Sequence, residues 1–435
     1  MSKRLFYKVT TFLFALISGF KVNFVGQLGA NEILAVLGST SVKNWKKLYS
    51  DIPDLQRVNI GYLVFLGFQM LSDLINHSSM ENMMRGQANI IFAVIVTNFL
   101  ARMIWKSPDS IIYYFVGSIL STMIWKASNV EDIGLEQMSV FKFTLVPMMN
   151  SGMLIITWYL LKKNILSKMG LASVLIAYGI FCIAFDARSN GMVFVVLSML
   201  FFFNSRIPRI TFKNALMMLV FLAIFFQGLF SIYVWQVLDG QIGGYHSKKQ
   251  LEMLEDPYNP MNLLIRGRSE TYVALLAIGD KPVFGHGSWA PDPGGKYTYM
   301  VLKLHNDEET FEGKFERANG KFIIPSHSII FGSWISAGLG GVLAILFVMY
   351  SFYRRAFAMI VDPDIQYSEY TIILFYFMIY LAWTFLFSPL PHIKQSIPIM
   401  LAFVLVIYRK YELMRHEEED EENEEESLEV QEYSE

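Results

Sequence analysis

Residues 370–387 read YTIILFYFMIYLAWTFLF and contain no charged side chain. A helix that crosses the ~30 Å hydrocarbon core of a membrane needs about 20 mostly apolar residues. Comparable apolar blocks recur at Ile90–Leu100, Ile111–Ile124, Met192–Phe203, Ala215–Phe230 and Gly338–Tyr350. Because a soluble fold could not hide so much apolar surface, the pattern predicts an all-α polytopic membrane protein.

The charges are distributed unevenly along the chain. Charged residues make up 17% of the sequence, against roughly 25% in an average soluble domain. Of the 38 acidic residues, 12 lie in Glu417–Glu435, whereas all 36 basic residues precede that stretch. The rest of the chain therefore has a net charge near +10, which suits anionic lipids and ligands. We expect residues 411–435 to form an acidic, disordered cytoplasmic tail.

Twelve apolar segments are long enough to be candidate membrane spans. They are 5–20, 22–40, 58–76, 86–104, 109–127, 143–162, 169–185, 190–204, 213–236, 326–351, 369–388 and 393–409. The predicted organisation is therefore nine spans in residues 1–236, a large loop at 237–325, and three more spans in residues 326–410.

The positive-inside rule gives this arrangement an orientation. With the N-terminus inside, basic residues flank every predicted inner connection. They are Lys3, Arg4, Lys43, Lys46, Lys47, Arg57, Arg102, Lys106, Lys162, Lys163, Lys168, Arg206, Arg209, Lys213, Arg354, Arg355, Arg409, Lys410 and Arg415. Met1–Phe20 has no convincing cleavage site, so we interpret it as an uncleaved first span. The prediction is a bacterial inner-membrane protein with both termini in the cytoplasm.

The same orientation places the loop 237–325 on the periplasmic side, between the ninth and tenth spans. It is far longer than a usual helix connection and contains aromatic, glycine and proline residues that indicate a folded cap. Within it, Asn262–Gly279 mixes apolar and charged residues, which predicts a helix on the membrane surface. The run Gly279–Pro282 should end that helix.

Several residues on the predicted outer side could take part in chemistry. Arg188 lies in the tight turn 186–191, where it could serve a site or simply pair with Asp186 at the membrane surface. Arg266 and Arg268 lie two residues apart and could equally form a solvated charged face.

Two further features lie on the same predicted side. The segment Lys281–Gly287 carries glycines that permit a tight turn. His327 opens a glycine-rich span, where it could act as a base or be structural. We find no metal-binding spacing of His, Cys or Asp on the outer side and no phosphate-binding glycine loop.

In order and spacing, these elements resemble the O-antigen polymerase and O-antigen ligase superfamily. The matching stretches are DARSNG at 186–191, RGRSETYVALLAIGDKPVFGHG at 266–287 and HSIIFGSWISAGLGGVLAILF at 327–347. One departure is that Ala187 precedes Arg188, where members of the family often have a serine.

The resemblance implies an inverting glycosyltransferase that needs no metal or other cofactor and uses an undecaprenyl-diphosphate-linked glycan as donor. It implies catalytic roles for His327, Arg188 and Arg268, and diphosphate binding by Arg188, Arg266 and Arg268. Gly279, Pro282, Gly285 and Gly287 would shape the loop. The expected partners are the lipid-linked oligosaccharide, membrane lipids and a regulator of chain length, with no nucleic acid.

Three functions remain open from the sequence. A polymerase would join lipid-linked repeat units, whereas a ligase would transfer the finished glycan to lipid A–core. A flippase for lipid-linked oligosaccharides is the alternative from another class. Paired broken helices in an internal repeat, which many transporters have, are not evident in this sequence.

Overall fold

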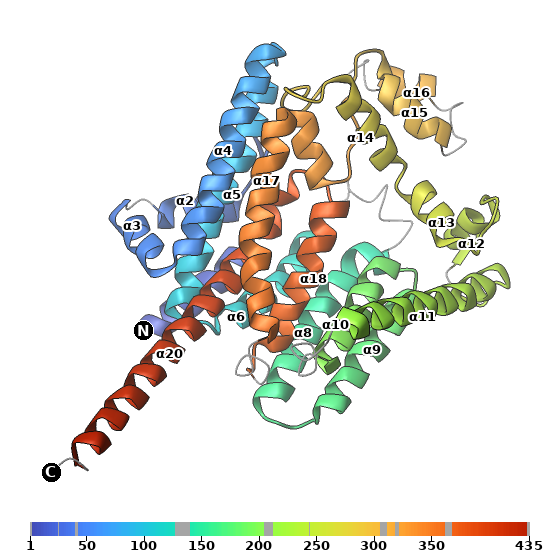
Figure 1. Cartoon of the computed structure of the whole chain (residues 1–435). Coiled ribbons are helices and arrows are strands. Elements are labelled where there is room, and N and C mark those ends of the chain that lie inside the picture. The colour runs from blue at the N-terminus through green and yellow to red at the C-terminus, as the bar shows by residue number, and fades with distance from the viewer. Residues whose placement is uncertain are drawn as a thin grey trace.

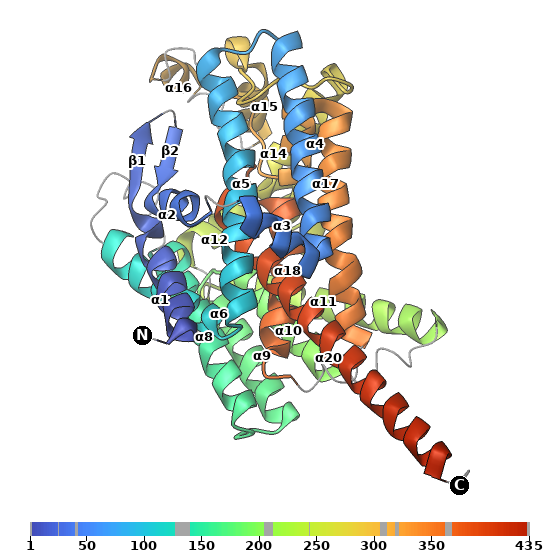
Figure 2. The same cartoon turned by 90° about the vertical axis from the view of Figure 1, so that its left-hand side faces the viewer.

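Three long helices, α4 (Pro53–Ile75), α5 (Met80–Lys106) and α17 (Ile329–Val361), run side by side through the molecule (Figure 1, Figure 2). This computed structural model describes residues 2–24, 26–39, 42–126, 140–203, 212–242, 244–304, 311–317, 322–361 and 368–432. Arg206 and Arg209, both predicted on the inner side, lie outside the described residues.

The other elements of the membrane body are mostly helices. They are α1 (Lys3–Leu16), α2 (Ala30–Gly38), α3 (Val42–Asp51), α6 (Ser110–Ser121), α8 (Val146–Lys162), α9 (Lys168–Ala184), α10 (Arg188–Phe203), α11 (Phe212–Leu238), α18 (Thr371–Phe387), α19 (His392–Gln395) and α20 (Ile397–Glu432). Short 3-10 or π-helical turns are η1 (Ile17–Gly19), η2 (Thr122–Lys126) and η4 (Phe141–Leu145). The loop 237–325 contributes α12 (Gly244–Glu252), α13 (Pro260–Gly267), α14 (Ser269–Asp280), η6 (Pro293–Gly295), α15 (Lys296–Leu304) and α16 (Phe311–Arg317).

Four of the described helical stretches are long and apolar enough to cross a membrane. They are Pro53–Ile75, Met80–Lys106, Phe141–Lys162 and Ile329–Ile360. Five shorter apolar helices accompany them, among them Thr371–Phe387, the helix of the uncharged stretch. The helical, apolar architecture is that of an all-α membrane protein, as the sequence predicts.

The predicted second span, 22–40, is wrong as a single helix. Strands β1 (Lys21–Phe24) and β2 (Gly26–Gly29) form an antiparallel hairpin there, and the nine-residue α2 follows. Gly26 has a φ of +100°, a conformation that glycine adopts without strain and that no helix contains. A helix overlaps each of the other eleven predicted ranges. One of them, α11, projects sideways from the bundle (Figure 1, Figure 2).

The acidic tail also differs from its prediction. The structure continues α20 as a helix to Glu432, where the sequence predicts disorder. Glutamate is among the better helix formers, and no glycine or proline interrupts 399–432. Helical propensity therefore extends the last apolar helix into the tail.

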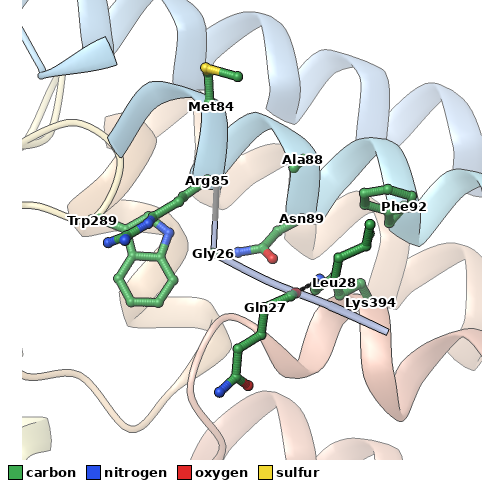
Figure 3. A pocket seen from close by; sticks show the side chains of 10 residues that line it. All are labelled: Gly26, Gln27, Leu28, Met84, Arg85, Ala88, Asn89, Phe92, Trp289 and Lys394. Atoms are coloured by element: carbon green, nitrogen blue, oxygen red, sulfur yellow. Dashed lines mark hydrogen bonds between the residues drawn. The ribbon is translucent and has the colours of Figure 1, made fainter. Parts of the chain in front are cut away.

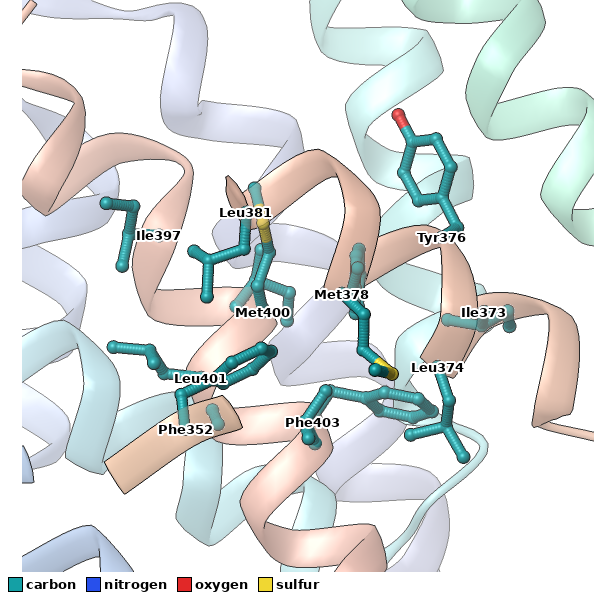
Figure 4. Packing of buried hydrophobic residues seen from close by; sticks show 14 of the residues in the cluster. Phe352, Ile373, Leu374, Tyr376, Met378, Leu381, Ile397, Met400, Leu401 and Phe403 are labelled. Atoms are coloured by element: carbon teal, nitrogen blue, oxygen red, sulfur yellow. The ribbon is translucent and has the colours of Figure 1, made fainter. Parts of the chain in front are cut away.

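The core lies where α17, α18 and α20 meet (Figure 4). Fully buried side chains from the three helices interlock there, including Phe352 of α17, Leu374 of α18 and Phe403 of α20. Because α18 buries residues on nearly all of its sides, it is the central helix of this group.

Glycine allows α4 and α17 to pack closely. A Cβ atom on Gly61 of α4 would lie 2.6 Å from Val348, and one on Gly340 of α17 would lie 2.4 Å from Phe68. Small residues at such contacts let two helix backbones approach each other, as is common in membranes.

The helix α17 is broken at Gly338, which has a φ of 65° and a ψ of −162°. The segment 282–287 fills the break. Leu339 donates its backbone N–H to the carbonyl of Val283 at 3.0 Å, and His286 donates to the carbonyl of Ile335 at 2.6 Å. The indole of Trp334 also donates to the carbonyl of Pro282 at 2.7 Å. The loop thus satisfies backbone groups beside the break in the helix.

The same loop is anchored to α4. Asn76 donates to the carbonyl of Gly285 at 3.1 Å. Ser288 donates its N–H and its hydroxyl to the fully buried carboxylate of Asp73, at 2.6 and 2.8 Å. The segment 282–288 therefore joins α14, α17 and α4 at one end of the bundle.

Replacing Gly338 by alanine should destabilise the protein. The new Cβ atom would lie 2.0 Å from the carbonyl oxygen of Val283, and the backbone there is essentially restricted to glycine. We expect a loss of at least about 1–3 kcal/mol and a melting temperature several degrees lower in detergent. Gly279→Ala is the matched control, because a Cβ at Gly279 meets open space. Equal melting temperatures for the two variants would contradict this role for the break.

Candidate functional site

Two of the predicted site residues, Arg268 and His327, lie where α14 begins, α17 begins and α18 ends. The predicted surface helix at 262–279 is wrong as one element, because α13 and α14 are separate helices that meet at Arg268. Arg268 has a φ of −142° and a ψ of 39°, outside the helical region, and follows Gly267. Arg268 therefore belongs to neither α13 nor α14. The helix α14 ends at Asp280, within the run Gly279–Pro282 that the sequence predicted to end it.

Arg268 is held against the end of α18. Its guanidinium carbon lies 5.1 Å from the ring centre of Phe387 and 5.7 Å from that of Trp383. One of its nitrogens donates to the carbonyl of Phe387 at 3.5 Å. Burial lowers the pKa of Arg268 and the nearby Glu270 carboxylate raises it, but a guanidinium stays charged at neutral pH.

Glu270, in the first turn of α14, lies close to His327. The Nδ1 atom of His327 is 3.8 Å from Oε1 of Glu270, which is too far for a hydrogen bond. The side chain of His327 is 50% exposed, so its ring is accessible to a substrate.

A second histidine, His392 of α19, adjoins this pair. It is more deeply buried than His327, and burial lowers its pKa, as do the nearby charges of Lys21 and His327. His392 is consequently neutral at pH 7. Nothing in the sequence assigned His392 to the site, because only the fold brings it near His327.

Arg188 is the first residue of α10, and its side chain makes three contacts. It forms an ion pair with Asp186 at 3.3 Å, donates to the amide oxygen of Gln250 at 2.9 Å, and lies over the ring of Tyr233 at 5.8 Å. The pairing with Asp186 considered from the sequence is therefore present. Because Gln250 belongs to α12, the loop covers Arg188.

Lys142 lies close enough to Arg188 and Arg268 for their charges to interact with its own. It also interacts by charge with Asp186. Three cations thus gather in one region, accompanied by Asp186 and by Glu270. The sequence showed Lys142 only as a scattered basic residue beside a predicted outer connection.

Of the four predicted loop-shaping residues, Gly285 and Gly287 have φ values of 72° and 88°, which favour glycine. Pro282 accepts the hydrogen bond from Trp334 through its backbone carbonyl, which any residue could supply. A Cβ on Gly285 would lie 2.6 Å from the backbone of α17. Gly279, in contrast, lies within α14 and faces open space. The side chain of Arg266 is outside the described part of the structure.

The arrangement can bind a strongly anionic group and orient a hydroxyl. The three cations of the site suit a phosphate or diphosphate, and the exposed His327 could accept a proton beside Glu270. In the part of the chain that the structure describes, no three His, Cys, Asp or Glu side chains form a group that could hold a metal ion.

Comparison with known proteins adds no assignment. No protein-family model matches this chain, and no curated protein is significantly similar to it in sequence.

The buried His392 should make stability depend on pH. Its pKa lies below the ordinary value of 6.5 in the folded protein, so the unfolded chain takes up a proton at a higher pH than the folded one. Stability present above pH 6.5 is therefore lost as the pH falls below it. His286, whose pKa is also lowered mainly by burial, acts in the same direction.

We expect His392→Gln to reduce the fall in melting temperature between pH 7.5 and pH 5.5 in detergent. His416→Gln, at an exposed histidine of α20, is the control and should leave the fall unchanged. An undiminished fall in the His392 variant would show that this ring does not carry the effect.

Proposed function

We propose that the protein is an O-antigen polymerase, a metal-independent, inverting glycosyltransferase that joins undecaprenyl-diphosphate-linked repeat units. The observation that supports this most is the grouping of Lys142, Arg188 and Arg268 beside the Glu270–His327 pair. The sequence resemblance supplies the reaction class, and the grouping has the charges that this reaction needs.

The donor's diphosphate would bind among the cations. As the bond between the anomeric carbon and the diphosphate oxygen breaks, negative charge develops on that oxygen. Guanidinium groups suit this charge because they are planar, permanently ionised and able to hold phosphate through two hydrogen bonds. Arg268 is held near the rings of Trp383 and Phe387 and bonded to the Phe387 carbonyl, which limits the positions its guanidinium can take.

The acceptor's hydroxyl would approach from the side of His327. The hydroxyl oxygen bonds to the anomeric carbon, its proton passes to His327, and undecaprenyl diphosphate leaves with the electron pair of the broken bond. Attack opposite the leaving group inverts the anomeric centre. Glu270 lies beside the ring that takes up this proton, with 3.8 Å between Nδ1 of His327 and Oε1 of Glu270.

The membrane placement belongs to the same proposal. The helices form about twelve crossings of a bacterial inner membrane, with both termini in the cytoplasm and the loop 237–325 in the periplasm. The polyprenyl tail of the donor then stays in the bilayer while its head group enters the site.

Substitutions in the site should abolish polymer formation in the native host. Arg268→Ala, Arg188→Ala and His327→Ala, made singly, should each leave lipopolysaccharide capped with one repeat unit. We expect a drop of at least about 100-fold in long-chain product, the scale of one lost transition-state contact or proton transfer. Arg268→Lys should recover little activity, because lysine keeps the charge but not the planar group.

The control is Arg57→Ala, a half-exposed arginine that pairs with Asp54 at the opposite end of α4. Immunoblots of membranes check that every variant accumulates. Wild-type chain length in all three site variants would refute the site. A complete loss of attached units in a deletion strain would instead indicate a ligase, and an unchanged ladder would refute both functions.

A further inference from the structure

A cavity of about 330 Å³ lies between the hairpin, α5 and the segment that follows 282–287 (Figure 3). Its volume is within the range of small-molecule sites. It shares no lining residue with the candidate functional site. The wall is mainly apolar, and Leu28, Ala88, Phe92 and Trp289 contribute to it.

The charged side chains of the wall are both cations. Arg85 and Lys394 line the cavity, and none of the described lining residues is a carboxylate. Lys394 is 8% exposed and uses its donors on Glu32, which lies behind the wall, and on the carbonyl of Gln27. Because the Glu32 carboxylate balances its charge, Lys394 adds little to the attraction of an anion, which rests on Arg85.

Arg85 is the group that can bind a ligand directly. It forms an ion pair with Glu81, an exposed residue outside the cavity wall. Among the described residues, its buried Nε atom has no hydrogen-bond partner. The side chain as a whole is one-third exposed, so a ligand in the cavity would contact the terminal nitrogens of the guanidinium and not the buried Nε.

Trp289 is fixed beside Arg85 in a strained conformation. Its φ is +48°, a value that a bulky residue rarely adopts. The hydrogen bonds of Ser288 to Asp73 and of Asn82 to the Trp289 carbonyl hold the backbone there. The indole consequently lies against the guanidinium, 5.8 Å from its carbon atom to the ring centre, and forms one end of the cavity (Figure 3). Strain of this kind is often found at binding sites.

The cavity changes character along α5. Arg85 and Trp289 lie at one end, near the start of α5, and Phe92, Leu28 and Lys394 lie at the other (Figure 3). At a rise of about 1.5 Å per residue, the seven residues from Arg85 to Phe92 span roughly 10 Å of the helix. An accessible arginine and an indole near a helix end, followed by apolar side chains and then by a lysine that is already ion-paired, match the polarity of a membrane surface.

We propose that this cavity binds the phosphate head group of an anionic membrane lipid, together with the first part of one of its chains. The phosphate accepts hydrogen bonds from Arg85 beneath the Trp289 ring, and the chain follows Ala88 towards Phe92. The site goes beyond the proposed glycosyl transfer and does not depend on it.

The test measures lipid binding to the purified full-length protein by native mass spectrometry. The probes are dioleoyl phosphatidylglycerol, dioleoyl phosphatidylcholine with the same chains, and water-soluble glycerol 3-phosphate. The wild type should bind phosphatidylglycerol about tenfold more tightly than phosphatidylcholine, because both carry the same phosphodiester but the choline cation of the latter is repelled by Arg85. Glycerol 3-phosphate should compete weakly, because it has no chain.

Two variants test the two halves of the site separately. Arg85→Gln should remove the preference for the anionic lipid. Ala88→Trp should weaken the binding of both lipids, because the indole would fill the apolar part of the cavity. Arg102→Gln, at another arginine of α5, is the matched control and should bind as the wild type does. Because the two cavity variants change different properties, a folding failure in one leaves the other informative.

Equal affinity of the wild type for the two lipids would overturn the proposal, as would an unchanged preference in Arg85→Gln. Competition by glycerol 3-phosphate at concentrations comparable to those of the lipid would also overturn it, in favour of a site for a soluble phosphate.

Discussion

The structure depends on the insertion of residues 282–287 into the broken helix α17. The carbonyl of Val283 accepts the N–H of Leu339 just past Gly338, and His286 donates to Ile335 just before it. A continuous helix would leave the loop without these partners, and a loop without its glycines could not approach the helix backbone. Because α14 leads directly into this loop, the insertion fixes α14 against α17. It thereby brings Arg268 and Glu270 beside His327.

The loop and the membrane body consequently share one site. Gln250 of α12 reaches from the loop to Arg188 of the body, and Arg268 rests on the last residues of α18. The loop is therefore a cover over a site built partly from the body rather than a separate domain. At the far end of the bundle, Asp109 accepts hydrogen bonds from Lys8 and Tyr370 and so links α1 to α18. The site thus rests on helices that are joined at both ends.

The sequence predicted apolar helices because apolar blocks of this kind favour helices in a membrane, and the structure has four that are long enough to cross one and five shorter ones among the described residues. It failed at 22–40, where composition alone suggested a span but Gly26 turns the chain into a hairpin. It also failed at the tail, where the helical propensity of glutamate continues α20 as a helix.

The glycines of 281–287 predicted a tight turn, and Gly285 and Gly287 do have positive φ values. The sequence did not show that this turn packs into the break of α17 at Gly338, because the two segments are far apart in the chain. The sequence predicted Arg188, Arg268 and His327 as site residues, and their roles remain a prediction. Lys142 and His392 were not predicted, because tertiary packing rather than local pattern places them near these residues. Gly279 is the opposite case, a residue that the motif selects but the structure does not explain. A Cβ atom at Gly279 would meet open space, so its surroundings do not require glycine.

The most direct test of the account is to supply the purified protein, in liposomes without divalent cations, with a synthetic undecaprenyl-diphosphate-linked repeat unit. The account predicts products of two or more units, with one undecaprenyl diphosphate released for each new glycosidic bond. Absence of longer products from active protein, or transfer only when lipid A–core is added, would contradict it.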